Sequence, residues 1–214
     1  MFQTFSWTHV GFLAHAAEWT ALLALIALSG GALGGLLIAV LRLSPLPAAQ
    51  YLARGFIMLV QGTPLLVQLF LAYFGAAFAG LDVPPLVAAA VAFTLYAAAF
   101  LGDIWRGAVE AIPRGQWEAA AALGLHRISR LRLVILPQAL RMTLPPAVGF
   151  LVQLVKATAV TSIIGFSELM KAANAINNAT FEPFTVYGIV AAIYFALCFP
   201  LTTYARRLEA KPGR

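Results

Sequence analysis

The segment Trp19–Leu41 reads WTALLALIALSGGALGGLLIAVL and contains no charged side chain. A helix needs about 20 predominantly apolar residues to cross the hydrocarbon core of a bilayer, and this segment is long enough. The rest of the chain has the same character, because 62% of its 214 residues are hydrophobic and only 10% are charged. Soluble domains carry about 25% charged residues, so the composition indicates an all-α protein that crosses a membrane several times.

Five segments are apolar and long enough to span a membrane, and we expect them to form one transmembrane domain over residues 1–214. Their predicted bounds are Trp19–Leu41, Arg54–Phe78, Val83–Trp105, Arg141–Ile163 and Phe184–Tyr204. Proline removes a backbone donor, so Pro64 is expected to kink the second span or open its first turns. For the same reason, Pro137 is expected to interrupt a short helix over 130–136 before the fourth span.

Four glycines in the first span, at positions 30, 31, 34 and 35, allow another helix to approach closely. The partner helix lies either within the chain or in a second subunit. The single cysteine, Cys198, argues against a disulfide framework and favours core packing. No Lys or Arg occurs in the first 41 residues, so a cleaved signal peptide is not expected.

The basic residues are distributed unevenly between the two sides of the membrane. The side with the first and third connections and the C-terminus has Arg42, Arg54, Arg106, Arg114, Arg127, Arg130, Arg132, Arg141, Arg206, Arg207, Lys211 and Arg214. The opposite loops contain only Lys171, and Lys156 falls inside the fourth span. Because cytoplasmic loops carry the excess of Lys and Arg, we expect the N-terminus outside and the C-terminus in the cytoplasm. The largest cytoplasmic feature is then a loop over about residues 106–140.

No motif for catalysis or metal binding stands out in the chain. The patterns HExxH, GxSxG and CxxC are absent, and so is the P-loop pattern GxxxxGK[ST]. We therefore expect no catalytic residue, no metal and no ATP bound through a P-loop. The net charge of +6 is explained by membrane topology and does not indicate nucleic-acid binding.

Within the large loop, residues 115–125 read GQWEAAAALGL and are predicted to be helical. Glu118 falls in the first turn, where the helix dipole favours an anion. Trp117, Ala120, Ala121 and Gly124 follow the i, i+3, i+4, i+7 spacing and predict a face of small residues with an aromatic residue at one end. This helix either lies on the membrane, with arginines at lipid phosphates, or docks a cytoplasmic partner.

Ionisable and polar residues inside the spans are candidates for function. Asp103, Arg106 and Glu110 are spaced i, i+3, i+7, which predicts a ladder of ion pairs. Lys156 lies about 22 Å into the fourth span from Arg141 at 1.5 Å per residue. Lys156 is expected to neutralise a carboxylate of a partner subunit, to form another structural pair, or to help gate a pathway. Further candidates for a polar pathway are Gln68, Tyr96, Gln153, Thr158, Thr161 and Ser162, with ordinary interhelical hydrogen bonding as the alternative.

Four motifs carry a resemblance to a known family. They are QGTPLLVQLFLAYFG at 61–75, IPRGQWEAAAALGL at 112–125, ILPQALR at 135–141 and KATAVTSIIGFSEL at 156–169. In this order they resemble permease subunits of polar amino-acid ABC importers, the branch that includes the histidine, glutamine, glutamate, arginine and opine systems. Glu118, Ala119 and Ala120, followed by Gly124, resemble the "EAA" loop of these permeases. The resemblance extends from about Trp19 to Glu209.

The resemblance implies a non-catalytic subunit of the bacterial inner membrane with the type I ABC importer permease fold. It implies that Trp117, Glu118, Ala119, Ala120 and Gly124 dock on a cytoplasmic ATPase dimer, which binds the ATP, so that this chain needs no cofactor. The other implied partners are a second permease subunit, identical or different, and an extracytoplasmic solute-binding protein.

Three motifs depart from the family pattern and leave the substrate open; in the fourth span, Ala159 and Val160 also stand where serine and leucine are common. Gln61 stands where arginine is usual, Ala157 where aspartate is usual, and Asp103 where glutamate is frequent. Two other classes of function remain as alternatives. A gradient-driven carrier or channel usually has more spans, often as inverted repeats. A membrane anchor or sensor would not need the deep Lys156 or the threonines that follow it.

Overall fold

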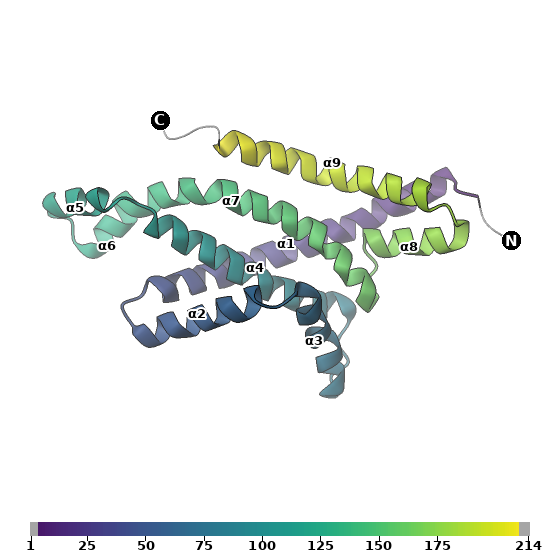
Figure 1. Ribbon diagram of the computed structural model, residues 1–214, viewed down its shortest axis with the longest axis horizontal. Helices are drawn as coiled ribbons and strands as arrows, with labels where there is room; N and C mark the ends of the chain where they lie inside the picture. The colour runs from purple at the N-terminus through teal and green to yellow at the C-terminus, as the bar shows by residue number, and fades with distance from the viewer. Residues whose placement is uncertain (1–3, 210–214) are drawn as a thin grey trace.

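The computed structural model describes residues 4–209, and every regular element in this range is helical. Four segments are long and apolar enough to cross a membrane: α1 (Trp7–Leu43), α4 (Pro85–Glu110), the run Arg127–Ile164 that contains α7 (Leu136–Ala157), and α9 (Pro183–Glu209). The bent pair α2 (Pro47–Gln61) and α3 (Leu65–Phe78) gives a fifth span when it is counted as one. The long helices follow the long axis of the molecule, whereas α3 projects away from it (Figure 1). The predicted all-α architecture with about five spans is confirmed.

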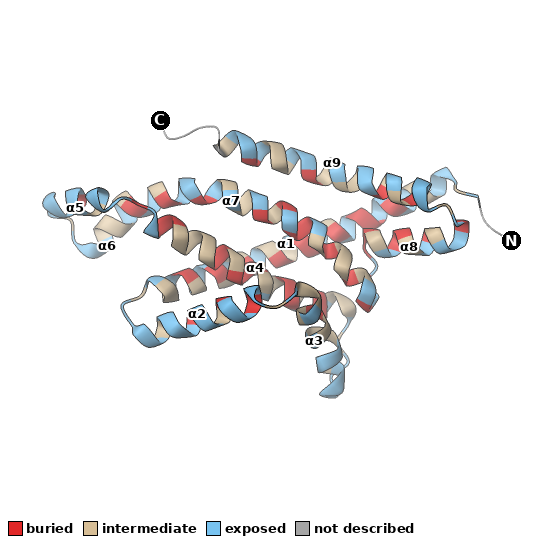
Figure 2. Ribbon diagram, viewed as in Figure 1, coloured by how far each residue is buried: buried red, intermediate tan, exposed pale blue. Residues whose placement is uncertain are grey.

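The outer surface of these helices is apolar. Many large hydrophobic side chains are exposed, such as Leu33, which is 75% exposed, and Phe184, which is 95% exposed. Exposed positions run along the outer sides of α2, α3 and α9, while buried positions concentrate where α1 and α4 meet (Figure 2). An apolar surface of this extent is suited to lipid or to another membrane subunit.

The closest helix contact in the molecule is between α1 and α4. A Cβ atom added at Gly31 would lie 2.3 Å from the Cβ of Ala97, and one added at Gly35 would lie 3.0 Å from the backbone nitrogen of Gly102. Gly30 and Gly34 face the side chains of Thr94 and Ala98 in the same way. Of the two expectations for these glycines, tight packing within the chain is the one that the structure bears out.

The second span differs from the prediction in its shape. Residues Arg54–Phe78 were expected to form one span whose first turns Pro64 kinks or opens, and in the structure α2 and α3 meet at 98°. Pro64 caps α3 from an extended conformation, and Gly62 caps the end of α2. Pro64 has no N–H, and its ring disfavours helical geometry at the preceding residue. The proline therefore divides the span near its middle. The sequence predicted a milder change, confined to the first turns.

The fourth span begins earlier than predicted. Pro137 was expected to end a short helix, but α6 (Arg127–Arg130), a π-helical turn at Leu131–Ile135 and α7 follow one another without a break. The N–H of Leu136 donates to the carbonyl of Leu131, five residues back. This wider turn accommodates the proline ring, which removes only one backbone donor from the ladder. After α7 the run tightens into a 3₁₀ helix, Thr158–Ile164.

Three other spans extend beyond their predicted bounds. α1 begins at Trp7 where Trp19 was expected, α4 continues past Trp105 to Glu110, and α9 runs from Pro183 to Glu209. The predicted loop over 106–140 therefore consists mostly of helix: the end of α4, α5 (Arg114–Ala122), α6 and the start of α7. Lys211 and Arg214, which were part of the basic C-terminal tail, lie outside the described residues.

At the opposite end from α5, a short helix connects the last two spans. α8 (Leu169–Thr180) has 12 residues, too few to cross a bilayer. Leu169, Ala173 and Ile176 are buried against Leu13 of α1 and Val186 of α9. α8 therefore lies beside the first turns of α9 and the N-terminal part of α1 (Figure 1).

Candidate functional site: the α5 segment and the polar residues of the spans

The short helix α5 is set apart from α4 and α6 by residues that favour its ends. Pro113 precedes it in an extended conformation, and Gly124 follows it with φ +75°. The N–H of Gly124 donates to the carbonyl of Ala121, and the N–H of Leu125 donates to that of Ala120. This pair of hydrogen bonds is a Schellman motif, which requires a left-handed residue after the helix. A Cβ at Gly124 would meet nothing within 4 Å, so the backbone conformation explains the glycine.

The two faces of α5 have different surroundings. Ala120 is 2% exposed, and Trp117, one turn before it, packs against the body of the protein. Glu118 and Ala119 are exposed, and so is Gly124. The sequence predicted a face of small residues made by Trp117, Ala120, Ala121 and Gly124, which would lie on the membrane or dock a partner. In the structure this face is divided: the chain's own core covers Ala120 and packs against Trp117, whereas Ala121 and Gly124 are exposed. The free face is the one with Glu118 and Ala119.

α5 is held in place by apolar contacts and by one hydrogen bond between side chains. Trp117 lies against a buried cluster formed by Ala108, Val109, Ile112, Ile135 and Ala139, which belong to α4, its C-terminal end, the π-turn and α7. The Nε2 of Gln138 donates to the Oε1 of Gln116 at 3.3 Å and to the carbonyl of Val134 at 2.8 Å. α5 is therefore fastened to both α4 and α7.

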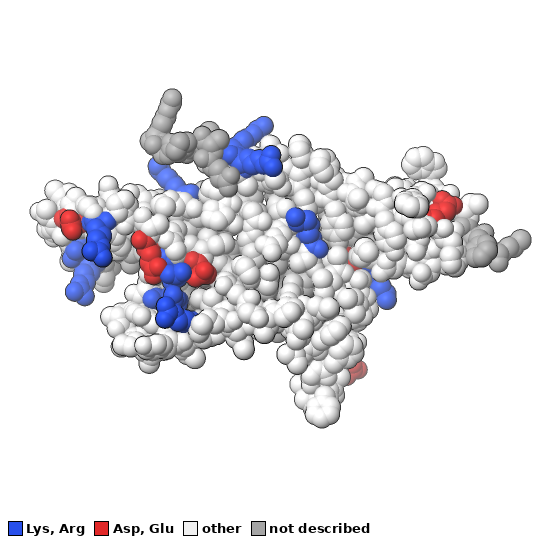
Figure 3. Space-filling model, viewed as in Figure 1, with Lys and Arg blue, Asp and Glu red and all other residues white. Residues whose placement is uncertain are grey.

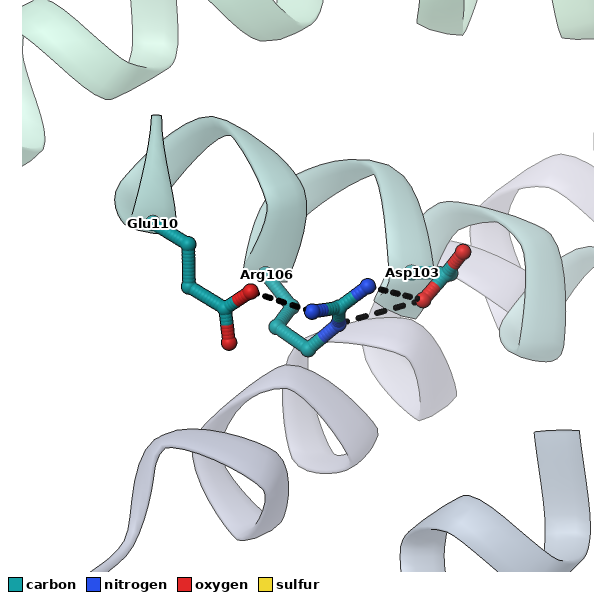
Figure 4. Close-up of polar contacts among 3 residues, drawn as sticks. All are labelled: Asp103, Arg106 and Glu110. Carbon is teal, nitrogen blue, oxygen red and sulfur yellow. Dashed lines mark hydrogen bonds and ion pairs between the residues drawn. The ribbon is translucent and has the colours of Figure 1, made fainter. Parts of the chain in front are cut away.

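The predicted charge ladder on α4 is confirmed (Figure 4). Arg106 donates to the Oδ1 of Asp103 through its Nε at 3.1 Å and through its terminal nitrogen at 2.9 Å. Its other terminal nitrogen donates to the Oε2 of Glu110. The Arg106 side chain is 21% exposed, while the carboxylates are 40% and 51% exposed. One guanidinium thus neutralises much of two carboxylates on one helix face.

Gln68, a predicted pathway residue, stabilises the break between α2 and α3. Its Nε2 donates to the carbonyl of Val60 at 2.7 Å, to that of Thr63 at 3.1 Å and to the Thr63 hydroxyl at 3.0 Å. These carbonyls would otherwise lack partners where the helix stops. The amide therefore has a structural role in this chain, in line with the interhelical hydrogen bonding that was the alternative for this residue.

Three predicted pathway residues lie in the 3₁₀ helix and bond to their own backbone. The hydroxyls of Thr158, Thr161 and Ser162 donate to the carbonyls of Val155, Thr158 and Ala159 at 2.7–2.8 Å. Thr158 and Thr161 are 0% exposed, whereas Ser162 is partly exposed. The two threonines do not line open space in this chain.

Tyr96 stands in an aromatic group where α4 meets α7. Its ring centroid lies 4.6 Å from that of Phe100 and 6.0 Å from that of Phe150. The Phe100 and Phe150 rings stack at 5.2 Å. The tyrosine is therefore positioned mainly by ring packing.

Gln153 and Lys156 lie one turn apart on α7, and both are exposed. Within the described part of the chain Lys156 forms no ion pair. A bare ammonium group in an apolar span is costly. Of the predicted pathway residues, these two have the open position that contact with a solute or with another subunit requires.

Among the described residues, one Asp, Glu, Lys or Arg side chain is buried, and it was not a sequence candidate. Glu168 is 0% exposed and precedes α8, where its Oε1 accepts from the N–H of Lys171 at 2.9 Å. Its Oε2 accepts from the hydroxyls of Thr20 at 3.4 Å and Tyr194 at 3.3 Å. One carboxylate therefore joins α1, α8 and α9. The only signal in the sequence was a glutamate three residues before the N–H that it caps.

Burial sets the protonation of this carboxyl group, which lies outside the candidate spans. Loss of hydration raises the pKa of Glu168, and that effect outweighs the N–H and hydroxyl donors that favour its charged form. The residues that pack around it are mainly apolar, such as Leu169 and Val186. Among the described residues, no group of three or more His, Cys, Asp or Glu side chains is placed to hold a metal ion.

Comparison with known proteins gives a consistent assignment. The family described as "Binding-protein-dependent transport system inner membrane component" matches residues 31–213. The "Probable amino-acid ABC transporter permease protein YckA" of Bacillus subtilis is 35% identical over 193 residues, which cover 90% of this chain and 85% of the relative. The "Glutamine transport system permease protein GlnP" of Escherichia coli strain K12 is 34% identical over 207 residues, which cover 96% and 94%.

Solved structures agree with the sequence relatives. A chain of an amino acid ABC transporter crystallised with histidines superposes with a TM-score of 0.91 and 31% identity, covering 98% of this chain and all of the other. A chain of the inward-facing MetNI methionine ABC transporter superposes with a TM-score of 0.82 at 22% identity, over 98% of this chain, and supports the fold alone. The predicted type I ABC importer permease fold is therefore confirmed.

Proposed function

The chain belongs to the family of binding-protein-dependent transport system inner membrane components, and on that premise we propose that it is the permease subunit of an ATP-driven importer of amino acids. In this role it forms part of the path across the inner membrane and catalyses no reaction. ATP is bound and hydrolysed by a separate ATPase dimer. The amino-acid substrate is proposed because YckA is named as an amino-acid permease and GlnP as a glutamine permease.

The free face of α5 is the proposed docking surface for the ATPase. Glu118 and Ala119 are exposed on it, and Gly124 ends it. A helix that receives force must be fixed to the spans that it moves, and Trp117 and Gln116 fix α5 to α4 and α7. This combination of a free face and a rigid base is the observation that carries the proposal. In this arrangement Trp117 and Ala120 position the surface and do not contact the ATPase directly.

The end with α5 is proposed to be cytoplasmic. Basic side chains gather in the half of the molecule that contains α5, α6 and the C-terminal end of α9 (Figure 3). Lys and Arg near span ends are retained on the cytoplasmic side. With this orientation the N-terminus and α8 lie outside, where a solute-binding protein would deliver the amino acid.

A second permease subunit is proposed to face α7. Lys156 and Gln153 are exposed in an otherwise apolar span, and Lys156 lacks a carboxylate partner within the described residues. An ammonium group at that depth is stable when it faces a polar path or a partner's acceptor groups. The partner would be an identical or a different permease, and the solute would pass between the two.

The docking proposal is tested by two substitutions on the free face, Glu118→Arg and Ala119→Trp. The permease is co-expressed with the ATPase and the second permease of its transporter, and each variant is compared with wild type. We expect both to reduce co-purification of the ATPase and transport-coupled ATP hydrolysis by at least tenfold, since charged and bulky residues at a packed contact cost about 1.4 kcal/mol or more. Ala196→Trp, on an exposed side of α9 away from both the α5 and the α8 ends, is the matched control and should leave both quantities unchanged.

Gly124 provides a second arm of the test. Gly124→Asn keeps the left-handed conformation accessible, whereas Gly124→Val does not. We expect coupling to be retained in the first variant and lost in the second. Normal assembly and hydrolysis in Glu118→Arg and Ala119→Trp would rule out docking through α5. Amino-acid uptake by the chain alone in liposomes would instead support a gradient-driven carrier.

A further inference from the structure

A basic pocket lies between α5 and the end of α4. Its volume is about 480 Å³, and Arg114, Arg127 and Arg130 line it together with Trp117 and Glu110. Glu110 already accepts from Arg106, so its charge is largely compensated. Among the described residues none of the three lining arginines forms an ion pair. The Nε of Arg130 is buried without a hydrogen-bond partner. The pocket therefore has an unmatched positive charge.

An apolar groove adjoins this pocket on the side of the membrane spans. Its volume is about 540 Å³, and it runs between the end of α1, α4 and α7, lined by residues such as Leu36, Val40, Trp105 and Leu140. Ser44 and Thr143 are its only residues with polar side chains apart from the Trp105 ring nitrogen. The groove and the pocket share Leu43, Val109 and Leu131. The two therefore adjoin at these residues, and the pair, called the cavity below, has an apolar body and a cationic mouth.

We propose that this cavity binds an anionic phospholipid, with the phosphate at Arg127 and Arg130 and an acyl chain in the groove. The apolar groove would be filled by a chain of methylene groups, each of which gains about 0.8 kcal/mol on burial. Basic pockets between transmembrane helices on the cytoplasmic side are suited to anionic headgroups. Lipid could occupy this site without any transport taking place, so lipid binding is a property separate from the proposed import of amino acids.

The position of Trp117 separates this site from the ATPase surface. Trp117 lines the pocket from the inner side of α5, whereas Glu118 and Ala119 are on the free side. A lipid in the cavity would touch α1, α4, α5 and α7 at once. It would therefore brace α5 against the spans while leaving its docking face open.

The test uses fluorescence quenching of Trp105, which lines the groove. Trp7, Trp19 and Trp117 are replaced by phenylalanine in the full chain, which is reconstituted into nanodiscs of zwitterionic phosphatidylcholine. Phosphatidylglycerol with brominated acyl chains is then titrated in, and brominated phosphatidylcholine is titrated in parallel. We expect phosphatidylglycerol to quench at a lower mole fraction. The fraction for half-maximal quenching should rise roughly fivefold for each arginine replaced in Arg127→Gln and Arg130→Gln.

Two matched controls distinguish the site from the general membrane surface. Arg141→Gln removes an exposed arginine of α7 that lines neither part of the cavity and should leave the titration unchanged. Val40→Phe should narrow the groove and reduce quenching, whereas Leu33→Phe, on an exposed part of α1 outside the groove, should not.

Three outcomes would overturn the proposal. Equal quenching by the two lipids would mean that the headgroup is not recognised. Loss of selectivity when millimolar inorganic phosphate is added would assign the mouth to a free anion. Loss of selectivity when the ATPase is bound would assign the arginines to the contact with that subunit.

Discussion

The two carboxylate clusters at opposite ends of this protein are built on different principles. On α4, Asp103 and Glu110 share Arg106, and all three side chains are partly exposed. Before α8, Glu168 is 0% exposed and is held by hydroxyl and N–H donors, without a cation among its hydrogen-bond partners. The first cluster lies on a single helix, whereas the second joins three helices.

The comparison shows that an ion pair recognisable in the sequence need not contribute most to the free energy of unfolding. Exposed i, i+3 and i, i+4 pairs contribute about 0.3–0.5 kcal/mol each. An enclosed carboxylate has lost its hydration, and each of its donors would be left unsatisfied without it, at a cost of about 1–3 kcal/mol per group. We therefore expect the contacts around Glu168 to contribute more to the free energy of unfolding than the ion pairs on α4.

The largest effect is expected for Glu168→Ala. This substitution removes the N-cap of α8 and leaves the N–H of Lys171 and the hydroxyls of Thr20 and Tyr194 without their acceptor. The free energy of unfolding should fall by about 3 kcal/mol, which lowers the melting temperature by roughly 10 °C in a chain of this size. Thermal unfolding of the detergent-purified protein measures it. Glu168→Gln, which keeps an acceptor oxygen, is the control, and equal losses in the two variants would contradict the hydrogen-bond argument.

The second effect is a dependence on pH. Because burial raises the pKa of Glu168, the native state holds this proton at pH values where the unfolded chain has lost it. The contribution to stability is complete below the ordinary glutamate pKa of 4.5 and is lost as pH rises through the raised value. The wild-type protein should therefore lose stability relative to Glu168→Gln as pH is raised. Melting curves at a series of pH values check this, and parallel curves for the two proteins would contradict it.

A smaller effect is expected for Tyr194→Phe. The change removes one hydroxyl donor of the Glu168 cluster and keeps the ring, so the free energy of unfolding should fall by about 1 kcal/mol. Tyr187→Phe provides a comparison on the same helix, since that hydroxyl donates to Asn174 and not to Glu168. In a double-mutant cycle, Tyr194→Phe should lose its effect in the Glu168→Ala background, whereas Tyr187→Phe should keep its own. Additivity of the Tyr194 and Glu168 substitutions would break the link between them.

The smallest effect is expected for Arg106→Gln on α4. Two partly exposed ion pairs are lost, and the free energy of unfolding should fall by less than about 1 kcal/mol, with less of a change at 0.5 M salt than at 0.05 M. Chemical denaturation at the two salt concentrations measures it. A loss as large as that of Glu168→Ala would reverse the ranking of the two clusters.

The features that could be predicted from the sequence are those determined by residues close to one another in the chain. The spans and the ladder of Asp103, Arg106 and Glu110 follow from apolar length and helical spacing, and both are confirmed. The motifs around Glu118 resembled the right family because they are contiguous in the chain. In each case neighbouring residues carry the information.

The misses depend on contacts between distant segments. Glu168 is 148 positions from Thr20, so its enclosure could not be read from its neighbours. The small residues of α5 are equally suited to the chain's own core and to a partner, and only packing decides that Ala120 faces inward. Pro137 is a helix breaker by local rules, but the π-turn before it preserves the helix. The docking and pathway roles remain predictions that await the experiments above.

The helix that runs without a break from α6 into the fourth span can act as a lever. From Arg130 to Lys156 the chain rises about 39 Å at 1.5 Å per residue, with no break in the helical run. A tilt of about 5° applied at the α6 end would displace the Lys156 end by about 3 Å, which is close to the diameter of a water molecule. If the helix moves as a rigid body, a small rotation at one surface of the membrane would therefore become a step of this size at the far side.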